Sequence, residues 1–326
     1  MSGLDVWSDV WPRQAIRMPA ADLPTPTRSA IMPGAPFLHA GRSELPLPDP
    51  HASSRRPLRP SDFPDWTSYY WTYQYELAST QLLPCLQSWG VWRQGVRILD
   101  VGCGDAGATC ALAEHGARID GFDLEPRRLA MASERARARG TELRLTVADI
   151  TDPATLTDLD GPYDLILFRD VLEHIPDVDA ALAQSRERLA PDGGIVVIYP
   201  PYWSVYGGHQ QILDARARLG VRWAKLPFVH WLGAGVWGGM ARGGAVSADL
   251  WQEVETVRQA GLTLSGLSER ASRHSLRVSQ ARRFLLRPSF YLRYGLPVFG
   301  AGLLGRVPGL REVLVTGSWE LLTRND

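Results

Sequence analysis

The sequence contains very little lysine and cysteine. Lys225 is the only lysine among 35 basic residues. No Gly-Lys-Ser/Thr phosphate loop is therefore available, and no Tyr-x-x-x-Lys dehydrogenase pair either, because Val221 stands four positions before Lys225. Cys85, Cys103 and Cys110 lack the spacing of zinc ligands and of a disulfide framework. We therefore expect neither a bound metal nor a disulfide-stabilised fold.

The sequence also lacks net charge, long apolar runs and a compact apolar segment near its N-terminus. Basic and acidic residues balance at 35 each, so no overall field favours nucleic acid or an acidic partner. No stretch of 18 apolar residues occurs, and these absences predict a soluble, cytoplasmic protein. Residues 284–304 are apolar with nearby arginines, but their prolines and glycines break any long helix, so this segment could contact a membrane only peripherally.

The most informative segment that is present is RILDVGCGDAG, at residues 97–107. Its apolar run is typical of a parallel strand that is buried on both faces. Gly102, Gly104 and Gly107 then let the backbone turn sharply and approach a ligand that a Cβ would obstruct. The following residues have a helix-compatible composition, so the turn opens onto a helix N-terminus with free N–H groups. The segment predicts a nucleotide-type site at the carboxyl end of a first strand.

The glycines alone do not identify the nucleotide. Their spacing fits the dinucleotide fingerprint, and Asp123 stands where an acidic residue would bind a ribose, at the end of a second strand. Asp100, however, lies just before the glycines. Its carboxylate could meet a cationic group such as an α-ammonium, whereas it would repel the pyrophosphate of NAD. The sequence therefore favours S-adenosylmethionine over NAD.

Five segments between residues 97 and 201 occur in a familiar order: LDVGCGDAG, GFDLEP, VADI, YDLILFRDVLEHIP and LAPDGGIVVIYPP. In these segments the chain resembles the class I S-adenosylmethionine-dependent methyltransferases, in particular the branch that acts on small molecules. The resemblance covers about a third of the chain and is specific as a set. Ala106 departs from the family pattern, which usually has its third glycine there, and Gly107 follows one residue later. The resemblance implies a methyltransferase that uses S-adenosylmethionine.

Alternating apolar strands and helical stretches predict an α/β fold, with a Rossmann-like, doubly wound sheet between two layers of helices. The resemblance implies seven strands, mostly parallel, with an antiparallel last strand. A content of 45% apolar residues in a chain of 326 is ample for one core. The expected strands lie at 97–101, 117–122, 142–147, 163–168, 193–199, 262–269 and 312–323, and the expected helices at 106–115, 126–139, 177–189 and 248–260.

The parts outside this core differ in composition. Residues 1–64 hold 12 of the 24 prolines and are expected to form an extended arm, either loose or wrapped around the domain. Residues 65–326 form the expected methyltransferase domain, which begins with an aromatic cap helix at 65–90. Segments 201–247 and 272–310 are expected to be lid insertions above the carboxyl ends of the strands, where ligands bind in open α/β sheets.

The resemblance assigns cofactor-binding roles by position. Asp100, Gly102 and Gly104 would line the methionine and ribose region, Asp123 would accept hydrogen bonds from both ribose hydroxyls, and Asp149 would meet the adenine amino group. Six further residues are expected around the cofactor: Leu124, Ile150, Phe168, Arg169, Tyr69 and Tyr73. The first two would lie beside the adenosine and the next two near the methionine moiety. The two tyrosines would form a lid over the methionine end, or pack as core aromatics.

The catalytic base is expected after the fifth strand. The stretch PPYWSVYGGHQ, at residues 200–210, resembles a PPY-x-S-P-x-GGH stretch in a subset of these methyltransferases. His209 follows two glycines, and an imidazole with a pKa near neutrality suits proton removal. His209 is therefore a candidate base, a hydrogen-bond donor to the substrate, or a structural residue, and His230 is a weaker candidate base. The VLEHI turn that contains His174 is expected to be structural.

The composition of the first insertion indicates the class of acceptor. Its aromatic residues form an apolar surround with few charges: Trp203, Tyr206, Trp223, Phe228, Trp231 and Trp237. Such a wall suits a planar or apolar small molecule. We expect O-methylation first, then N- or C-methylation. The alternatives are a regulatory or scaffold protein that binds the cofactor without turnover, and an NAD-dependent oxidoreductase. A nucleic-acid methyltransferase is disfavoured, because no Asn/Asp-Pro-Pro-Tyr/Phe motif follows the fourth strand and no basic domain is present.

Overall fold

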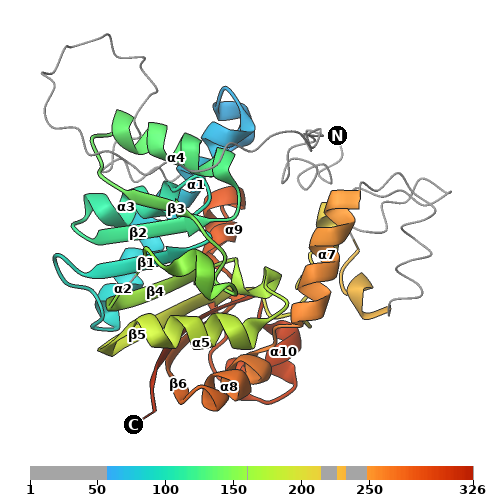
Figure 1. Cartoon of the computed structure of the whole chain (residues 1–326). Coiled ribbons are helices and arrows are strands. Elements are labelled where there is room, and N and C mark those ends of the chain that lie inside the picture. The colour runs from blue at the N-terminus through green and yellow to red at the C-terminus, as the bar shows by residue number, and fades with distance from the viewer. Residues whose placement is uncertain (1–56, 160, 214–225, 233–247, 326) are drawn as a thin grey trace, which may run out of the picture.

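The computed structural model describes residues 57–159, 161–213, 226–232 and 248–325. The strands in this part of the chain form a single sheet: β1 (Arg97–Val101), β2 (Arg118–Asp123), β3 (Arg144–Val147), β4 (Tyr163–Arg169), β5 (Leu189–Tyr199), β6 (Leu276–Leu286), β7 (Phe299–Gly300) and β8 (Gly317–Arg324). Their order is β3-β2-β1-β4-β5-β8-β6-β7, and Figure 1 shows the succession from β3 to β5. The first five strands are parallel, and β8 is antiparallel to both β5 and β6. The Rossmann-like sheet with an antiparallel last strand is confirmed, with the two-residue β7 added at one edge.

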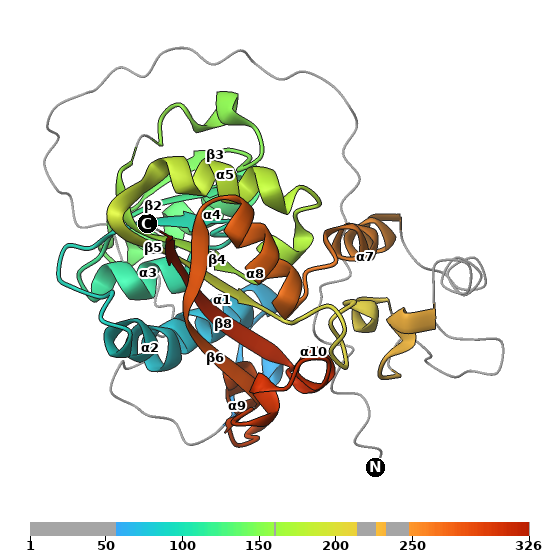
Figure 2. The same ribbon diagram turned by 90° about the horizontal axis from the view of Figure 1, so that it is seen from below.

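Helices cover both faces of this sheet: α1 (Trp66–Leu77), α2 (Leu83–Ser88), α3 (Gly107–Glu114), α4 (Pro126–Ala138), α5 (Val178–Arg188), α7 (Ala248–Ala260), α8 (Leu264–Arg273), α9 (Pro288–Tyr294) and α10 (Leu310–Leu314). In Figure 2, α5 and α8 lie on one side of the strands, and α2 and α3 lie on the other. Helix α1 packs on α3, and a five-residue π-helical turn joins it to α2.

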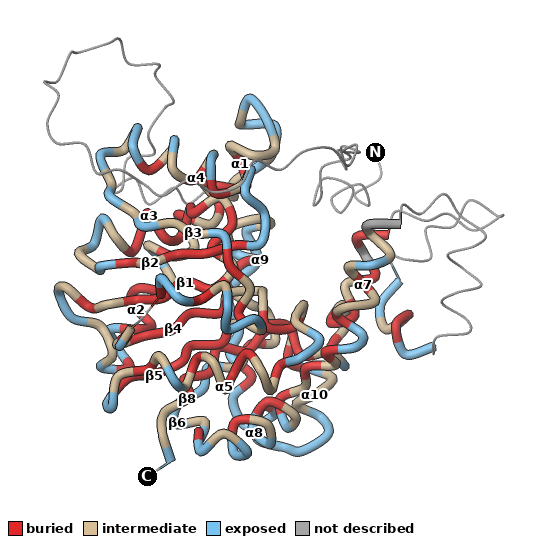
Figure 3. Tube along the Cα trace, in the orientation of Figure 1, coloured by how far each residue is buried: buried red, intermediate tan, exposed pale blue. Residues whose placement is uncertain are grey.

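The alternation of side chains along the strands divides the core between the two faces. Ile98 packs with α2 and α3, whereas its neighbours Leu99 and Val101 pack with α5 and α8 on the opposite face. All three are at most 2% exposed, which explains why the segment is a continuous apolar run. The buried residues concentrate in the strands, as the red segments of Figure 3 show.

The topology places a ligand site between β1 and β4. The chain runs outward from β1 through β2 to β3 and then returns to form β4 on the other side of β1. At such a reversal, the loops that follow the two central strands separate, and open α/β sheets bind their ligands in the crevice there. The site is therefore expected above Val101 and Arg169, the last residues of β1 and β4.

The expected strand at 262–269 is wrong. Helix α8 begins at Leu264, and the strand that pairs with β8 is β6, at 276–286. The apolar alternation around Leu262, Leu264 and Leu267 fits a helix as well as a strand over so short a span. Thr263 decides between the two, because its side chain accepts a hydrogen bond from the N–H of Gly266 at 2.9 Å and caps the helix.

The two expected insertions differ in how they relate to the sheet: the described part of the first packs on α7, whereas part of the second is a strand of the sheet. In the first, residues Ile212, Leu213 and Val229 form a small apolar cluster with Val254 of α7. Its segments 214–225 and 233–247, which include Trp223 and Trp237, lie outside the described residues. The second was expected at 272–310, but its residues 276–286 are β6 and belong to the sheet. Only the stretch between β6 and β8 lies outside the strands, apart from the short β7.

Most of the expected arm, residues 1–56, lies outside the described residues. Its last residues lie against α9, where the N–H of Leu58 donates to the carbonyl of Leu292 at 2.8 Å. Beyond α9, several apolar side chains are exposed: Leu296, Val298, Phe299, Leu303, Leu304 and Val307. No helix in the described part of the chain is long and apolar enough to cross a membrane. Peripheral membrane contact by this stretch stays a prediction.

Candidate functional site

The turn after β1 has the conformation for which its glycines were expected. Gly102 and Gly104 have φ values of 65° and 57°, which favour glycine. A Cβ on Gly102 would lie 2.7 Å from a methyl group of Val171, so the loop after β4 packs closely over this turn. Ala106, where the family usually has glycine, also has a left-handed φ of 58°. The alanine therefore keeps the glycine-type turn, at a cost of about 1–2 kcal/mol.

Asp123 ends β2 beside this turn, with its carboxylate held by two backbone groups. Its Oδ2 accepts from the N–H of Gly104 at 2.9 Å, and its Oδ1 accepts from the N–H of Glu125 at 3.0 Å. The guanidinium of Arg128 lies over Gly104, where a Cβ would be only 2.3 Å from it, and it pairs with Asp105 at 3.1 Å. A ligand that approached Gly104 would have to displace this guanidinium. Leu124, next to Asp123, is 67% exposed and free to pack against a ligand.

Asp100 has an internal partner that the sequence did not predict. Its buried carboxylate accepts from the hydroxyl of Thr109 at 2.6 Å and forms an ion pair with Arg169 at 3.0 Å. Arg169 also donates to Oε1 of Gln74 in α1 at 3.3 Å. The contact of Asp100 with a ligand ammonium stays a prediction. The pair shows in addition that Arg169, at the end of β4, is a cation beside the glycine turn and could accept a ligand carboxylate.

The aromatic helix α1 presents a different side to the site from the one expected. Tyr69 and Tyr73 are each 3% exposed and stack on one another, and Arg293 of α9 lies over the Tyr73 ring at 4.3 Å. They therefore pack toward α9. Tyr70 and Gln74 occupy the next helical position around α1, and the Gln74 amide donates to the Tyr70 hydroxyl at 2.9 Å. Since Gln74 also contacts Arg169, these two residues are the ones that α1 brings to the site.

Asp149, Ile150 and Phe168, three other residues expected at the cofactor, lie near the carboxyl ends of β3 and β4. Their side chains make different contacts. Asp149 is half-buried, and its Oδ1 accepts from the N–H and the hydroxyl of Thr151 at 2.8 Å. Ile150 and Phe168 are at most 2% exposed and belong to the core on the α5 side. The side chains of Ile150 and Phe168 are thus part of the core, and their contact with a cofactor stays a prediction.

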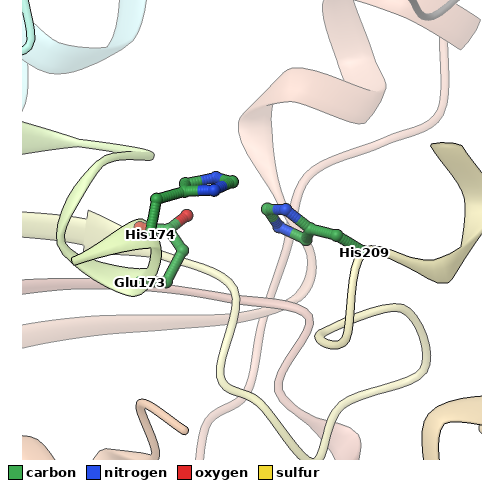
Figure 4. A group of neighbouring side chains, drawn as sticks. All are labelled: Glu173, His174 and His209. Carbon is green, nitrogen blue, oxygen red and sulfur yellow. The ribbon is translucent and has the colours of Figure 1, made fainter. Parts of the chain in front are cut away.

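His209 does not stand alone after β5. It faces His174 of the VLEHI turn, with the two ring centroids 4.8 Å apart, and Glu173 lies beside both, as Figure 4 shows. One potential ligand atom from each of the three residues lies within 4.8 Å of the other two. Glu173 and His174 belong to a short 3₁₀ turn after β4, and His209 ends a Gly-Gly turn with a φ of 54°. The two loops that cross the carboxyl edge of the sheet therefore meet at this cluster.

Burial shifts the pKa of each of these three groups toward its neutral form. It lowers the pKa of His209 well below the ordinary value, with His174 and Arg287 adding to the effect. It lowers the pKa of His174 to about 4. It raises the pKa of Glu173 well above the ordinary value, and the nearby negative charge of Asp170 raises it further. At neutral pH both imidazoles are uncharged and each keeps one nitrogen lone pair.

His230 is buried and contacts the backbone of the loop after β5, as a structural residue does. Its Nε2 lies 2.7 Å from the carbonyl oxygen of Tyr202, which accepts a hydrogen bond if that nitrogen carries the proton. A Cβ on Gly208 would lie 2.4 Å from the Cβ of His230, so the Gly-Gly turn packs directly on this histidine. Burial lowers the pKa of His230 to about 4. The weaker candidate base thus fixes the loop that carries His209, and its role in chemistry stays a prediction.

Two small pockets lie at this edge of the sheet. One is lined by residues of the first insertion and of α7, among them Tyr202, His230 and Trp251. The other lies under α1, with Gln74, Arg169 and Asp170 in its lining. Neither is lined by Asp123, because Arg128 covers that side of the glycine turn. Both pockets therefore lie away from Asp123, where the ribose was expected.

The residues present fit S-adenosylmethionine. Gly102 and Gly104 hold the left-handed turn that lets the backbone approach a ligand, and the Arg128 guanidinium over Gly104 would move aside for it. Each carboxylate oxygen of Asp123 accepts one backbone N–H and has a further lone pair that can accept a hydroxyl. Arg169 supplies a cation for a carboxylate, and Leu124 an exposed apolar surface.

Comparison with known proteins places this site in a family. Residues 70–232, half of the chain, match the family model described as a methyltransferase domain. A ubiquinone biosynthesis O-methyltransferase from Leptothrix cholodnii is 33% identical over 104 residues, which cover 32% of this chain and 43% of the relative. The enzyme of the same description from Xylella fastidiosa is 33% identical over 103 residues, with 32% and 41% covered. The chain thus spans about two fifths of the length of these curated relatives.

Among solved structures, the fold is similar to a methyltransferase from Methanosarcina mazei, with a TM-score of 0.47, 12% identity and coverage of 73% of this chain and 96% of the other. It is also similar to magnesium protoporphyrin IX methyltransferase from Synechocystis, solved with bound S-adenosylhomocysteine, with a TM-score of 0.45, 14% identity and coverage of 78% and 86%.

Proposed function

The chain belongs to the methyltransferase domain family, and we propose that it is an S-adenosylmethionine-dependent methyltransferase that methylates an oxygen atom of a small aromatic or apolar molecule. One observation carries the proposal. The glycine turn with Asp123 and the cluster around His209 lie on neighbouring loops at the carboxyl edge of the sheet, joined by the close packing of Val171 on Gly102. This neighbourhood supports a cofactor site next to an acceptor site.

On the cofactor side, we assign binding to residues that present polar groups to the turn. Asp123 would bind the ribose hydroxyls, and Arg169, supported by Asp100 and Gln74, would bind the carboxylate. S-adenosylmethionine supplies an activated methyl group when it is bound. The protein therefore has to orient the acceptor, exclude water and accept a proton.

On the acceptor side, His209 is the residue we assign to the hydroxyl that is methylated. Its imidazole is neutral because burial and the neighbouring His174 lower its pKa, so a nitrogen lone pair is available at neutral pH. The described aromatic residues of the first insertion surround this loop: Tyr202, Trp203, Phe228 and Trp231. Trp203 and Trp231 are 42% and 44% exposed, so their rings have faces left to cover an apolar molecule.

The names of the curated relatives favour oxygen as the methylated atom, because those proteins are described as O-methyltransferases. The aromatic surround favours a ring-bearing acceptor. Together they support a hydroxylated aromatic compound as the substrate class. The earlier alternatives, a protein without turnover and an NAD-dependent oxidoreductase, do not agree with the family to which the chain belongs.

The proposal is tested by incubating the purified chain with S-adenosylmethionine carrying a labelled methyl group and a panel of phenols, catechols, aliphatic alcohols and aromatic amines. We expect label in an ether product of a hydroxylated aromatic compound, identified by mass spectrometry and by the methyl resonance in NMR. Transfer to nitrogen or carbon acceptors only would contradict the choice of oxygen. No transfer to any member of the panel, with the cofactor bound, would contradict the substrate class.

A prediction follows for cofactor binding. Asp123→Ala removes a carboxylate that binds hydroxyls, and loss of a charge-assisted contact typically costs about 1.5–3 kcal/mol. We expect the affinity for S-adenosylhomocysteine, measured by calorimetric titration, to fall by about 10- to 150-fold. Asp120→Ala is the matched control, because this residue lies in the same strand and its carboxylate accepts from the hydroxyl of Tyr163 at 2.7 Å, away from the glycine turn. Equal affinity of the Asp123 variant and the wild type, with an intact fold, would remove the assignment.

A further inference from the structure

The cluster of Glu173, His174 and His209 has the donor set of a metal site. Two imidazoles and one carboxylate are the ligands of catalytic zinc in several hydrolases and of the facial triad of non-haem iron. Here the donors come from two loops, a 3₁₀ turn after β4 and the Gly-Gly turn after β5, and their ligand atoms lie within 4.8 Å of one another. Figure 4 shows the carboxylate and the rings directed toward a common region.

Glu173 supplies an independent indication of a ligand. Its side chain is 1% exposed, and neither carboxylate oxygen has a hydrogen-bond partner among the residues that the structure describes. A buried carboxyl group without a partner is costly in either protonation state, because its oxygens have lost water and gained no hydrogen bond in exchange. Asp170, whose negative charge acts on Glu173, increases that cost. A cation between Glu173 and the two histidines would remove both penalties.

We propose that Glu173, His174 and His209 bind one divalent first-row transition metal ion, which holds the hydroxyl oxygen of the acceptor. The inference deepens the proposed function and rests on it for the role of the ion, although not for its binding. Three protein ligands leave at least one open coordination position, as catalytic sites require. His209 follows Tyr202 and Trp203 on the same loop after β5, so the cluster shares that loop with aromatic residues of the first insertion.

The distances fit such an ion after a small closure. With bonds of about 2.0–2.2 Å, two ligand atoms on one ion can be no more than about 4.3 Å apart. The cluster spans up to 4.8 Å, so the ligand atoms would close by roughly 0.5 Å or more on binding. Rotation of the Glu173, His174 and His209 side chains can supply this adjustment, since the Gly207-Gly208 turn itself packs on His230. Nitrogen and carboxylate ligands suit Mn²⁺, Fe²⁺, Co²⁺ or Zn²⁺ rather than Mg²⁺ or Ca²⁺.

The ion would act as a Lewis acid toward the acceptor. Coordination lowers the pKa of a bound hydroxyl, as it does for bound water. The acceptor oxygen loses its proton to solvent and forms a bond to the methyl carbon, while the carbon–sulfur bond breaks and its electron pair passes to sulfur. The sulfonium becomes a neutral thioether, and no oxidant or reductant is needed. His209 then contributes as a ligand of the ion rather than as the base itself.

The test measures metal binding directly. Purified chain, freed of metal with a chelator and saturated with S-adenosylhomocysteine, is titrated with Mn²⁺ by calorimetry and by electron paramagnetic resonance. We expect one Mn²⁺ per chain and electron–nuclear couplings to imidazole nitrogen. Glu173→Gln, His174→Asn and His209→Asn should each weaken binding by at least ~10-fold, and the two histidine variants should each lose nitrogen coupling. His115→Asn is the matched control, because the His115 ring contacts the carbonyl of Ala111 away from the cluster.

The outcomes separate this inference from the proposed function. Absence of stoichiometric Mn²⁺ binding to the wild type, or binding by all three variants at wild-type affinity, would overturn the metal site even if methyl transfer is found. Binding that is lost in the variants but kept by His115→Asn supports the site even if every acceptor in the panel fails. Retained affinity for S-adenosylhomocysteine and an unchanged circular dichroism spectrum show that the variants are folded.

Discussion

Replacing His209 by alanine is expected to lower the rate of methyl transfer by about 10²- to 10⁴-fold, while the affinity for the cofactor changes little. A group that handles the acceptor proton typically contributes a factor of this size. The residue reaches the site on the loop after β5 and faces His174, not the glycine turn that would bind the cofactor. The measurement is single-turnover transfer with labelled S-adenosylmethionine, beside calorimetric titration of the cofactor product.

His209→Asn separates the two roles that the structure allows for this imidazole. Asparagine keeps a hydrogen-bonding group but neither accepts a proton nor binds a transition metal well. A residue that only positions the acceptor would be largely rescued, whereas a base or a metal ligand would not. Addition of a chelator to the wild type then distinguishes base from ligand. A turnover of the alanine variant within threefold of the wild type, at saturating acceptor, would exclude all three roles.

Replacing Arg283 by methionine is expected to lower the free energy of unfolding by about 3–5 kcal/mol, because it leaves a buried charge without its partner. Glu320, in β8, is fully buried, and burial raises the pKa of its carboxyl while Arg283 opposes that shift. The Arg283 guanidinium donates to Oε1 of Glu320 at 3.1 Å and to the carbonyl of Gly305 at 3.0 Å. Urea unfolding monitored by circular dichroism measures the change.

The double variant Arg283→Met with Glu320→Leu should recover most of this loss, since apolar pairs often replace buried ion pairs with little penalty. Arg282→Met is the control from the same strand, because its guanidinium donates to the hydroxyl of Ser88 near the surface and should cost less than about 1 kcal/mol. If Arg283→Met and Arg282→Met are equally stable, the buried pair does not stabilise the junction of β6 and β8.

Much of the fold could be predicted because, in the segment that forms the parallel strands, the apolar runs and the glycine turns indicate the same architecture. The strand residues Ile98, Leu99 and Val101 are apolar because both faces of β1 are covered, and Gly102 and Gly104 after them have left-handed φ values that glycine adopts readily. The end of the sheet was harder. The apolar spacing at 262–267 suits either a strand or a helix, and the deciding contact is a side-chain cap at Thr263.

The position of a site residue could be predicted where the end of a strand determines it. The contacts between side chains of different elements were harder to predict. Asp123 ends β2 beside Gly104 as a Gly-x-Asp strand ending suggests. Asp100 pairs with Arg169 because β1 and β4 are neighbours in the sheet, and the sequence alone does not show which strands are neighbours. Which side of α1 faces the site depends on the packing of α9. Arg293 of α9 lies over the Tyr73 ring, so this side of α1 is turned toward α9.

The proposed metal cluster could not be predicted from the sequence for a similar reason. The expectation of no metal rested on cysteine spacing, whereas the donors proposed here are a Glu-His pair and a histidine 35 positions further on. No short motif signals such a separation. The available signal was the coincidence of a VLEHI turn after β4 with a Gly-Gly-His turn after β5, because neighbouring parallel strands bring the loops that follow them to the same edge of the sheet.

The position of β8 in the sheet also affects how the protein is made. Strand β8 separates β6 from the parallel half, and its residues pair with β5 residues that lie more than a hundred positions earlier in the chain. A ribosome releases residues 276–286 well before residues 317–324. During that interval β6 has no strand through which to join the sheet, and its apolar residues, such as Phe284, remain without their final cover. Until β8 is available, β6 is an unpaired strand whose edge can pair with a strand of another chain.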